Sequence, residues 1–281
     1  MSKIADFFVI GGTKCGTTSL YAWMSEHSGI ALTPKEWRGF LDRPARTDFP
    51  VSSAGKLRGA FANGYTRDPV YPSPAQAIVR AYPEARFVYL LRDPVDRMVS
   101  HYRHRLVTGT EWRSVDRAWQ DCPSYLAASR YGHQLRLYLD CVERDRMLVV
   151  RSEDLFSEPA RTLQRICDFV GVPCEDRPLP KDNRAAARRT MPLALRQLAR
   201  TPRLRKHLRS FARTGLGKLL AGRPPSEAPL LLGKQTCNFV FSELRNDQAL
   251  LNVLCLGIST DWDLSDERAR QLQGNDDEYC R

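Results

Sequence analysis

The fold is decided at Gly11-Gly12-Thr13-Lys14-Cys15-Gly16-Thr17-Thr18. An apolar run, Phe7–Ile10, leads into this stretch, and a helix-like segment, Thr18–Met24, follows it. A strand, a glycine-rich turn and a helix are typical of a phosphate-binding cradle, because glycines let backbone N–H groups point inward and the helix N-terminus is partially positive. The hydroxyls of Thr17 and Thr18 stand where they can cap the helix or contact a phosphate oxygen. The stretch therefore favours phosphate binding over a plain tight turn.

The position of the lysine separates this cradle from the loop of ordinary ATP-using enzymes. That loop reads G-x-x-x-x-G-K-[ST], with the lysine directly after the last glycine. Here Gly11, Gly16 and Thr18 keep the spacing, but Thr17 replaces the lysine and Lys14 lies inside the loop. A lysine placed earlier must approach the phosphates from another direction. The order of residues in this loop therefore indicates a nucleotide with a 5′-phosphate and argues against ordinary use of ATP.

Length and composition are those of a globular protein. A chain of 281 residues with 42% hydrophobic residues fits one large α/β domain. No apolar run approaches the roughly 18 residues that span a bilayer. Residues 1–6 also lack the long apolar core of a signal peptide. We therefore expect a cytoplasmic protein.

The eight cysteines form no C-x-x-C pair. We expect free thiols rather than a disulfide framework or a metal site. Cys15 differs from the others because it lies in the cradle beside a helix N-terminus, where the pKa of a thiol falls. A nucleophilic Cys15 is the alternative to a small residue that merely fills the loop, although the sequence offers it no base partner.

The net charge of +11 comes from one segment. Residues 181–223 hold thirteen Lys or Arg and one Asp, a net +12 that leaves the rest of the chain near neutrality. Leucines in this segment are compatible with amphipathic helices near 185–222. The segment is a solvated helix pair, a surface that attracts an anionic ligand, or a contact for an acidic membrane. Because the charge is local, we expect no nucleic-acid partner.

Strand and helix patterns alternate along the chain. They predict strands at 4–10, 29–32, 58–62, 86–91 and 147–150, and helices at 17–27, 73–82, 92–105, 114–121, 131–144, 157–171 and 238–256. We expect Ser73 to cap one helix, Ser157 to open another, and the tail from Ser265 to fray. The alternation predicts an α/β fold of P-loop type, with a central, mostly parallel sheet flanked by helices. The chain would be a single domain, 1–281, with its core at 4–175 and 236–264 and a basic helical insertion at 181–223.

A second candidate site follows the strongest strand pattern, 86–91. Arg92 ends that strand, at the edge where open α/β sheets place their ligands. Ser100 lies eight residues later on the next helix, so a guanidinium and a hydroxyl can converge on one anion. The alternative is that Arg92 forms an ion pair with Asp93 or Asp96.

Together these motifs resemble the PAPS-dependent sulfotransferase family (PAPS is 3′-phosphoadenosine 5′-phosphosulfate), and especially its bacterial and heparan-sulfate-type members. The cradle resembles the family's 5′-phosphosulfate loop, and Arg92 with Ser100 resembles its 3′-phosphate pair. Lys35-Glu36 followed by Phe40 resembles its KE…FF stretch. Residues 148–155 and 166–173 resemble its RYEDL…FLGLP block.

The resemblance implies transfer of a sulfuryl group from PAPS to a hydroxyl or amine of a small-molecule or carbohydrate acceptor. PAP, the desulfated nucleotide, would be the product, and no metal would be needed. Lys14 would stabilise the leaving phosphate and Glu36 would be the general base. His101 and His104 are the alternative bases, since another branch of the family uses a histidine. The cofactor-binding residues so implied are Thr13, Lys14, Cys15, Gly16, Thr17, Thr18, Arg92 and Ser100.

Two other functions stay open at this point. A small-molecule kinase on the same scaffold would need a lysine where Thr17 stands. A non-enzymatic nucleotide- or polyanion-binding protein would use the basic segment. The sequence does not determine the acceptor, the choice between O- and N-sulfation, the oligomeric state, or the third cofactor-contacting loop within 176–235.

Overall fold

The structure is a computed structural model that describes residues 5–42, 55–180, 230–254, 258 and 260–273. The predicted basic helices near 185–222 lie outside the described residues. Within the described part, contacts divide the chain into two compact units. Of the described residues, the first unit comprises 5–42, 55–97, 126–180, 243–254, 258 and 260–262, and the second comprises 98–125, 230–242 and 263–273.

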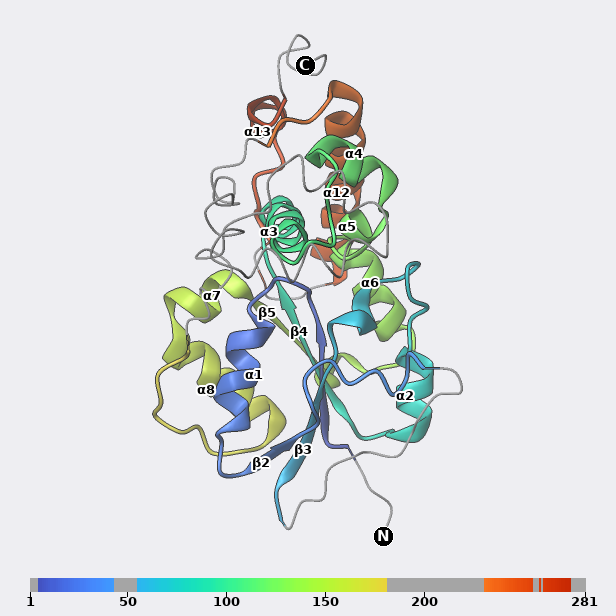
Figure 1. Cartoon of the computed structure of the whole chain (residues 1–281). Helices are drawn as coiled ribbons and strands as arrows, with labels where there is room; N and C mark the ends of the chain where they lie inside the picture. The colour runs from blue at the N-terminus through green and yellow to red at the C-terminus, as the bar shows by residue number, and fades with distance from the viewer. Residues whose placement is uncertain (1–4, 43–54, 181–229, 255–257, 259, 274–281) are drawn as a thin grey trace. The chain divides into compact units, whose positions relative to one another are not determined.

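The first unit holds a five-stranded parallel sheet (Figure 1). Its strands run in the order β2-β3-β1-β4-β5, and every neighbouring pair is parallel. Their bounds are β1 Phe7–Gly11, β2 Ile30–Leu32, β3 Leu57–Phe61, β4 Arg86–Leu91 and β5 Met147–Arg151. The central strands are nearly all apolar because both faces of the sheet are covered. The predicted α/β fold with a parallel sheet is confirmed.

Helices lie on both faces of this sheet. In Figure 1, α1, α7 and α8 lie on one face and α2 and α6 on the other. The helical bounds are α1 Thr17–Ser25, η1 Asn63–Thr66, α2 Ala75–Ala81, α3 Pro94–Val107, α4 Val115–Asp121, α5 Ser124–Ala127, α6 Tyr131–Leu139, η2 Arg144–Arg146, α7 Ser152–Ser157, α8 Pro159–Val170, α12 Lys234–Leu254 and α13 Asp266–Gln271. Among these described helices, none has the length and apolarity that crossing a membrane requires.

Aromatic side chains fill the core beneath one face of the sheet. The ring of Phe8 stacks on Phe87 with centroids 5.8 Å apart, and it also meets Tyr82 and Phe40 at 5.7 and 6.2 Å. Phe40 belongs to the loop after β2, so its burial ties that loop to the sheet. Each such aromatic pair adds about 0.5–1.5 kcal/mol beyond the area that it buries.

Two predicted helix boundaries are wrong. Pro74, not Ser73, is the residue before α2, and Ser73 only accepts a long 3.4 Å bond from the Ala75 amide. Ser157 ends α7 rather than opening the next helix, because Pro159 lacks an N–H and suits the first position of α8. The end of α8 at Gly171, which has φ of 91°, agrees with the predicted stop.

The tail after Ser265 is ordered through Gln271, contrary to expectation. Ser265 caps α13 by accepting a hydrogen bond from the Arg268 amide at 3.2 Å. In the same unit, Cys237 Sγ donates to Ala269 O at 3.2 Å. The capping serine and this contact hold a charged helix that composition alone predicted to fray.

Candidate active site

The cradle forms where β1 ends and α1 begins, as predicted. Gly16 precedes α1 with a left-handed backbone, φ 85°, and a Cβ there would lie 3.1 Å from the Phe156 ring. On the strand side, Thr66 Oγ1 donates to Ile10 O at 3.0 Å. A Cβ on Gly11 would collide with Thr66. The turn therefore needs glycine at both Gly11 and Gly16.

The threonines of the cradle have different surroundings. Thr17 is buried, whereas Thr18 is exposed and accepts a hydrogen bond from Lys35 Nζ. Thr13 Oγ1 is buried and has no hydrogen-bond partner within the part of the chain that the structure describes. A buried hydroxyl without a partner is uncommon and can mark a place that an ion or water completes. The Cys15 amide serves the turn itself, donating to Gly12 O at 3.2 Å.

The expectation of a lowered pKa for Cys15 is wrong. Burial raises the pKa of this thiol to about 11, and the opposing charges of Arg97 and Arg92 and the Tyr131 hydroxyl do not offset it. Its Sγ lies 3.7 Å from Tyr131 Oη and is fully buried. Desolvation disfavours the thiolate more than the nearby helix N-terminus favours it. Cys15 is thus buried in the loop, and its thiol stays almost wholly protonated at neutral pH.

Glu36 is held at the same edge of the sheet as the cradle. Its carboxylate accepts hydrogen bonds from Asn63 Nδ2 at 2.6 Å and from the Asn63 amide at 3.2 Å, at the start of η1. The neighbouring Lys35 reaches Thr18 of the cradle, and the Trp37 amide donates to Phe61 O at the end of β3. The loop carrying Glu36 is therefore tied both to α1 and to the carboxyl end of β3. Asn63 is a residue that sequence reasoning missed.

Two non-glycine residues in the described ranges have a positive φ, Lys14 at 68° and Glu36 at 62°. The left-handed region is costly for residues with a Cβ, and such strain persists where the surrounding structure enforces it. Strained backbone of this kind clusters at functional sites. The two residues that the sequence suggested for chemistry are thus also the two strained ones.

Arg92 follows β4, at the predicted strand end, and forms an exposed ion pair. Its guanidinium lies 3.8 Å from Asp96 Oδ2, with side chains 34% and 53% exposed, so the pair contributes at most about 1 kcal/mol. Asp93 caps α3 by accepting from the Asp96 amide at 2.9 Å. Ser100 lies on α3 and is half-buried. Arg92 and Ser100 fall in different units, and their convergence on one anion stays a prediction.

Arg97 is a buried cation that the sequence did not single out. It is fully buried, its Nε donates to Ser129 Oγ, and burial lowers its pKa. Its charge acts on Cys15 and Tyr131 beside the cradle. In the sequence, Arg97 looks like one more charge on an exposed helix, so no pattern distinguished it.

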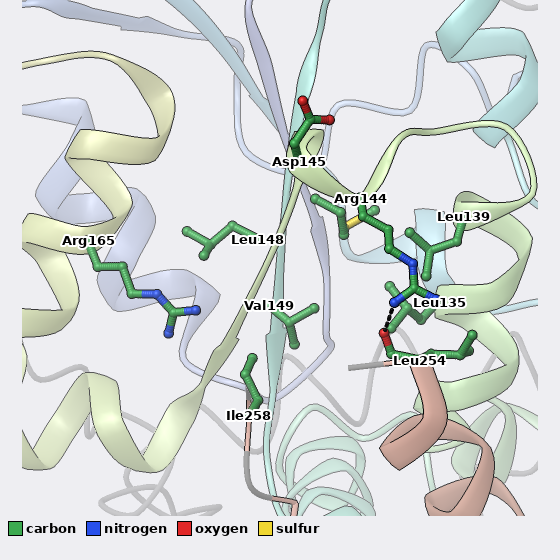
Figure 2. A pocket seen from close by; sticks show the side chains of 10 residues that line it. Leu135, Leu139, Arg144, Asp145, Leu148, Val149, Arg165, Leu254 and Ile258 are labelled. Atoms are coloured by element: carbon green, nitrogen blue, oxygen red, sulfur yellow. Dashed lines mark hydrogen bonds between the residues drawn. The ribbon is translucent and has the colours of Figure 1, made fainter. Parts of the chain in front are cut away.

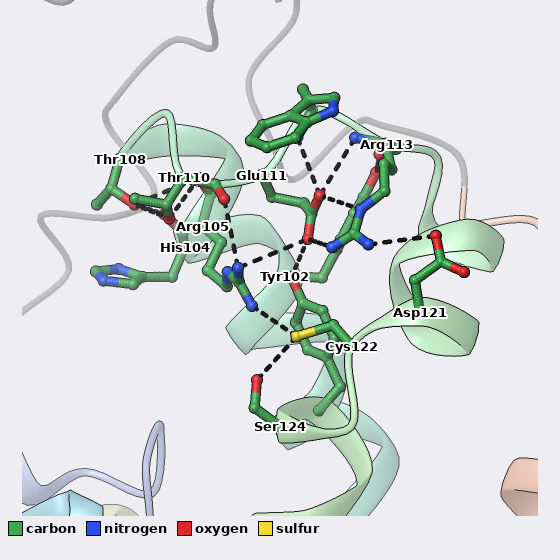
Figure 3. A network of polar contacts seen from close by, with 12 residues as sticks. Tyr102, His104, Arg105, Thr108, Thr110, Glu111, Arg113, Asp121, Cys122 and Ser124 are labelled. Carbon is green, nitrogen blue, oxygen red and sulfur yellow. Dashed lines mark hydrogen bonds and ion pairs between the residues drawn. The ribbon is translucent and has the colours of Figure 1, made fainter. Parts of the chain in front are cut away.

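The alternative bases His101 and His104 lie in the second unit. His101 is buried, and its ring packs on Tyr125 at 4.8 Å. Figure 3 shows a polar network centred on Glu111, and His104 lies at its margin, where its backbone carbonyl accepts from Thr108 Oγ1 at 3.0 Å. Glu111 is fully buried and accepts from Arg113 Nε at 2.8 Å and from Tyr125 Oη at 3.0 Å. This network stabilises its own unit, and the burial of His101 argues against a role as base.

Comparisons with known proteins point to one family. The family model described as "Sulfotransferase family" matches residues 56–176. The bifunctional heparan sulfate N-deacetylase/N-sulfotransferase 2 of Bos taurus is 23% identical over 199 residues, which are 60% of this chain and 22% of that protein. The heparan sulfate glucosamine 3-O-sulfotransferase 3B1 of Mus musculus is 24% identical over 190 residues, 60% of this chain and 47% of that protein. The chain thus spans less than half the length of these relatives.

A solved structure confirms the fold. The sulfotransferase from Alicyclobacillus acidocaldarius superposes with a TM-score of 0.64 at 21% identity, over 92% of this chain and 98% of that one. The cradle and Glu36 precede residue 56, where the match to the family model begins. Their roles therefore depend on the geometry described above.

Proposed function

The chain belongs to the sulfotransferase family, and we propose that it transfers a sulfuryl group from PAPS to a hydroxyl or amine of a carbohydrate or small-molecule acceptor. In this reaction the bond from sulfur to the bridging oxygen breaks, and a bond from sulfur to the acceptor forms. PAPS supplies the activated sulfuryl group. The protein must hold two reactants in line, neutralise the leaving phosphate and accept one proton.

The cradle is suited to the 5′-phosphosulfate end of the donor. Lys14 and Gly16 have a left-handed backbone within the turn. Left-handed residues in a turn point successive backbone N–H groups to the same side, where they form a concave anion-binding site. The buried Thr13 hydroxyl offers one further hydrogen bond. Lys14 supplies a compact positive charge beside the phosphate, where negative charge grows as the sulfur–oxygen bond breaks.

Glu36 is the proposed general base. Asn63 donates two hydrogen bonds to its carboxylate, which orients the side chain. The proton of the acceptor hydroxyl or amine would move to Glu36 as the new bond to sulfur forms. Arg92 and Ser100 are proposed to hold the 3′-phosphate, with Arg92 leaving its weak contact with Asp96.

The observation that carries the proposal is the shared strain of Lys14 and Glu36, joined by the contact from Lys35 to Thr18. A loop held in an unfavourable conformation and tied to the cradle is what a positioned base requires. The names of the matched relatives include heparan sulfate, which favours carbohydrate acceptors for the first trials. A cytoplasmic location stays a prediction, and contact of segment 181–223 with an anionic membrane stays the least favoured of the three interpretations of that segment.

Nucleotide binding tests the donor half of the proposal. At 100 times its dissociation constant, PAP should stabilise the protein by about 2.7 kcal/mol, a rise in melting temperature of about 5–10 °C. ATP with Mg²⁺ should give a smaller shift. Stabilisation by ATP–Mg²⁺ with none by PAP would instead indicate a kinase.

Turnover tests the roles of the residues. A screen of heparan-type oligosaccharides, phenols and amines with PAPS should identify an acceptor by its gain of a sulfuryl group. With that acceptor, Glu36→Gln should bind PAP normally and lose turnover, whereas Arg92→Ala should mainly weaken PAP binding. Transfer at the wild-type rate by Glu36→Gln would place the base elsewhere.

A further inference from the structure

A pocket of about 270 Å³ lies beside the first half of β5 in the first unit. β5 is one of the two edge strands of the sheet. Figure 2 shows the side chains that line the pocket. The pocket begins at Met147, which is in register with Phe87 of β4. The cradle, by contrast, follows the carboxyl end of β1, and none of its residues lines this pocket. The two sites are therefore separate.

Seven of the ten described residues that line the pocket are apolar, and three are charged. Leu135 and Leu139 are one turn apart on α6 and line the same wall. Leu148 and Val149 are successive residues of β5, so their side chains point to opposite faces of the strand. Figure 2 shows them on the two sides of β5. The pocket thus has apolar side chains on both sides of the edge strand.

Two arginines border this surface, and only one has a described partner. Arg144 donates to Leu254 O, the last carbonyl of α12, at 3.1 Å (Figure 2), which satisfies an open helix end. Arg165 on α8 is exposed and lines the pocket. Within the described part of the chain it has no ion pair or hydrogen bond. Asp145 also lines the pocket, so the pair of arginines leaves a net positive charge.

From this arrangement we propose that the pocket binds a small anionic amphiphile, a carboxylate or sulfate on a short unbranched alkyl chain. The alkyl chain lies along Leu135, Leu139 and Leu148, and the anionic group pairs with Arg165. The volume is just below the roughly 300–1,000 Å³ of pockets for drug-sized ligands, which suits a short chain. Apolar side chains beside an available cation are complementary to both parts of such a ligand.

Calorimetric titration of the full chain with sodium hexanoate and sodium octanoate, both dissolved as monomers, tests the apolar part. Each methylene that enters an apolar site raises affinity by about fourfold, so octanoate should bind about fifteenfold more tightly than hexanoate. Octyl sulfate should bind as octanoate does. Equal affinities for hexanoate and octanoate, or no binding of octanoate at millimolar concentration, would overturn the proposal.

Charge substitutions test the polar part. Arg165→Ala should weaken octanoate binding at least tenfold and leave binding of neutral octan-1-ol unchanged. Arg165→Glu should reverse the preference and favour octylammonium. Arg161→Ala is the matched control, because Arg161 lies one turn earlier on α8, is 85% exposed and pairs with Glu158 outside the pocket. If Arg165→Ala and Arg161→Ala bind octanoate equally well, the anion does not pair with Arg165 and the proposal is wrong.

Discussion

The strained backbone at Lys14 makes a prediction that separates stability from function. Lys14→Gly and Lys14→Ala both remove the lysine side chain and its contacts, and they differ only in the Cβ. A left-handed residue with a Cβ costs roughly 1–2 kcal/mol, whereas glycine loses about 0.5–1 kcal/mol more chain entropy on folding. With φ at 68°, the glycine variant should be more stable than the alanine variant by about 1 kcal/mol.

The measurement is urea unfolding followed by circular dichroism, with equal slopes required for the two variants. Gln164 is the matched control, because it is exposed on α8 in an ordinary helical conformation. There glycine should be less stable than alanine by about 1 kcal/mol. The two positions should therefore differ in sign. Glu36→Gly and Glu36→Ala should behave as the Lys14 pair does, since Glu36 has φ of 62°.

Neither Lys14 variant should transfer a sulfuryl group, because both lack the cation that we propose stabilises the leaving phosphate. A gain in stability at the expense of activity is the pattern expected of a strained active site. If glycine is no better than alanine at Lys14, as at Gln164, the left-handed strain is not stored there. The inference from strain to function would then be refuted.

Three further predictions concern other groups of the structure. Asn63→Ala should lower kcat with little change in KM for PAPS, since Glu36 loses the hydrogen bonds that orient its carboxylate. Steady-state kinetics would measure both constants. A change in KM alone would contradict this role of Asn63. Burial raises the pKa of Cys15 to about 11, so about 0.1% of it should be thiolate at pH 8. Cys122 should react with iodoacetamide far faster, because hydrogen bonds with Ser124 and Arg105 lower its pKa despite burial. Equal labelling of the two cysteines by mass spectrometry would argue against this difference in pKa. Glu111→Gln should cost about 3 kcal/mol in urea unfolding at pH 7. Burial opposes ionisation of Glu111, but its hydrogen bonds with Arg113 hold its pKa below 4.5. The contribution of the ionised Glu111 to the free energy of unfolding is therefore complete above pH 4.5 and is lost as the pH falls through the folded pKa. If Glu111→Gln were equally destabilising at pH 3 and pH 7, the contribution would not come from the ionised carboxylate.

The sequence predicted most of the fold because the signals for it are local. Each strand of a parallel sheet covered on both faces is a short apolar run, and all five strands were predicted within a few residues. The starts of the helices were predicted less accurately than the strands. At Ser73 and Ser157 the pattern of a capping residue was present, but a neighbouring proline set the boundary instead.

The candidate site divides in the same way. The local pattern predicted the strand, turn and helix of the cradle, because the spacing of Gly11, Lys14 and Gly16 acts within one turn of chain. The surroundings of the cradle depend on the tertiary fold. Glu36 meets Asn63 from 27 residues away, and Cys15 meets Tyr131 from 116 residues away. Burial and hydrogen-bond partners depend on such distant segments, and no local pattern records them.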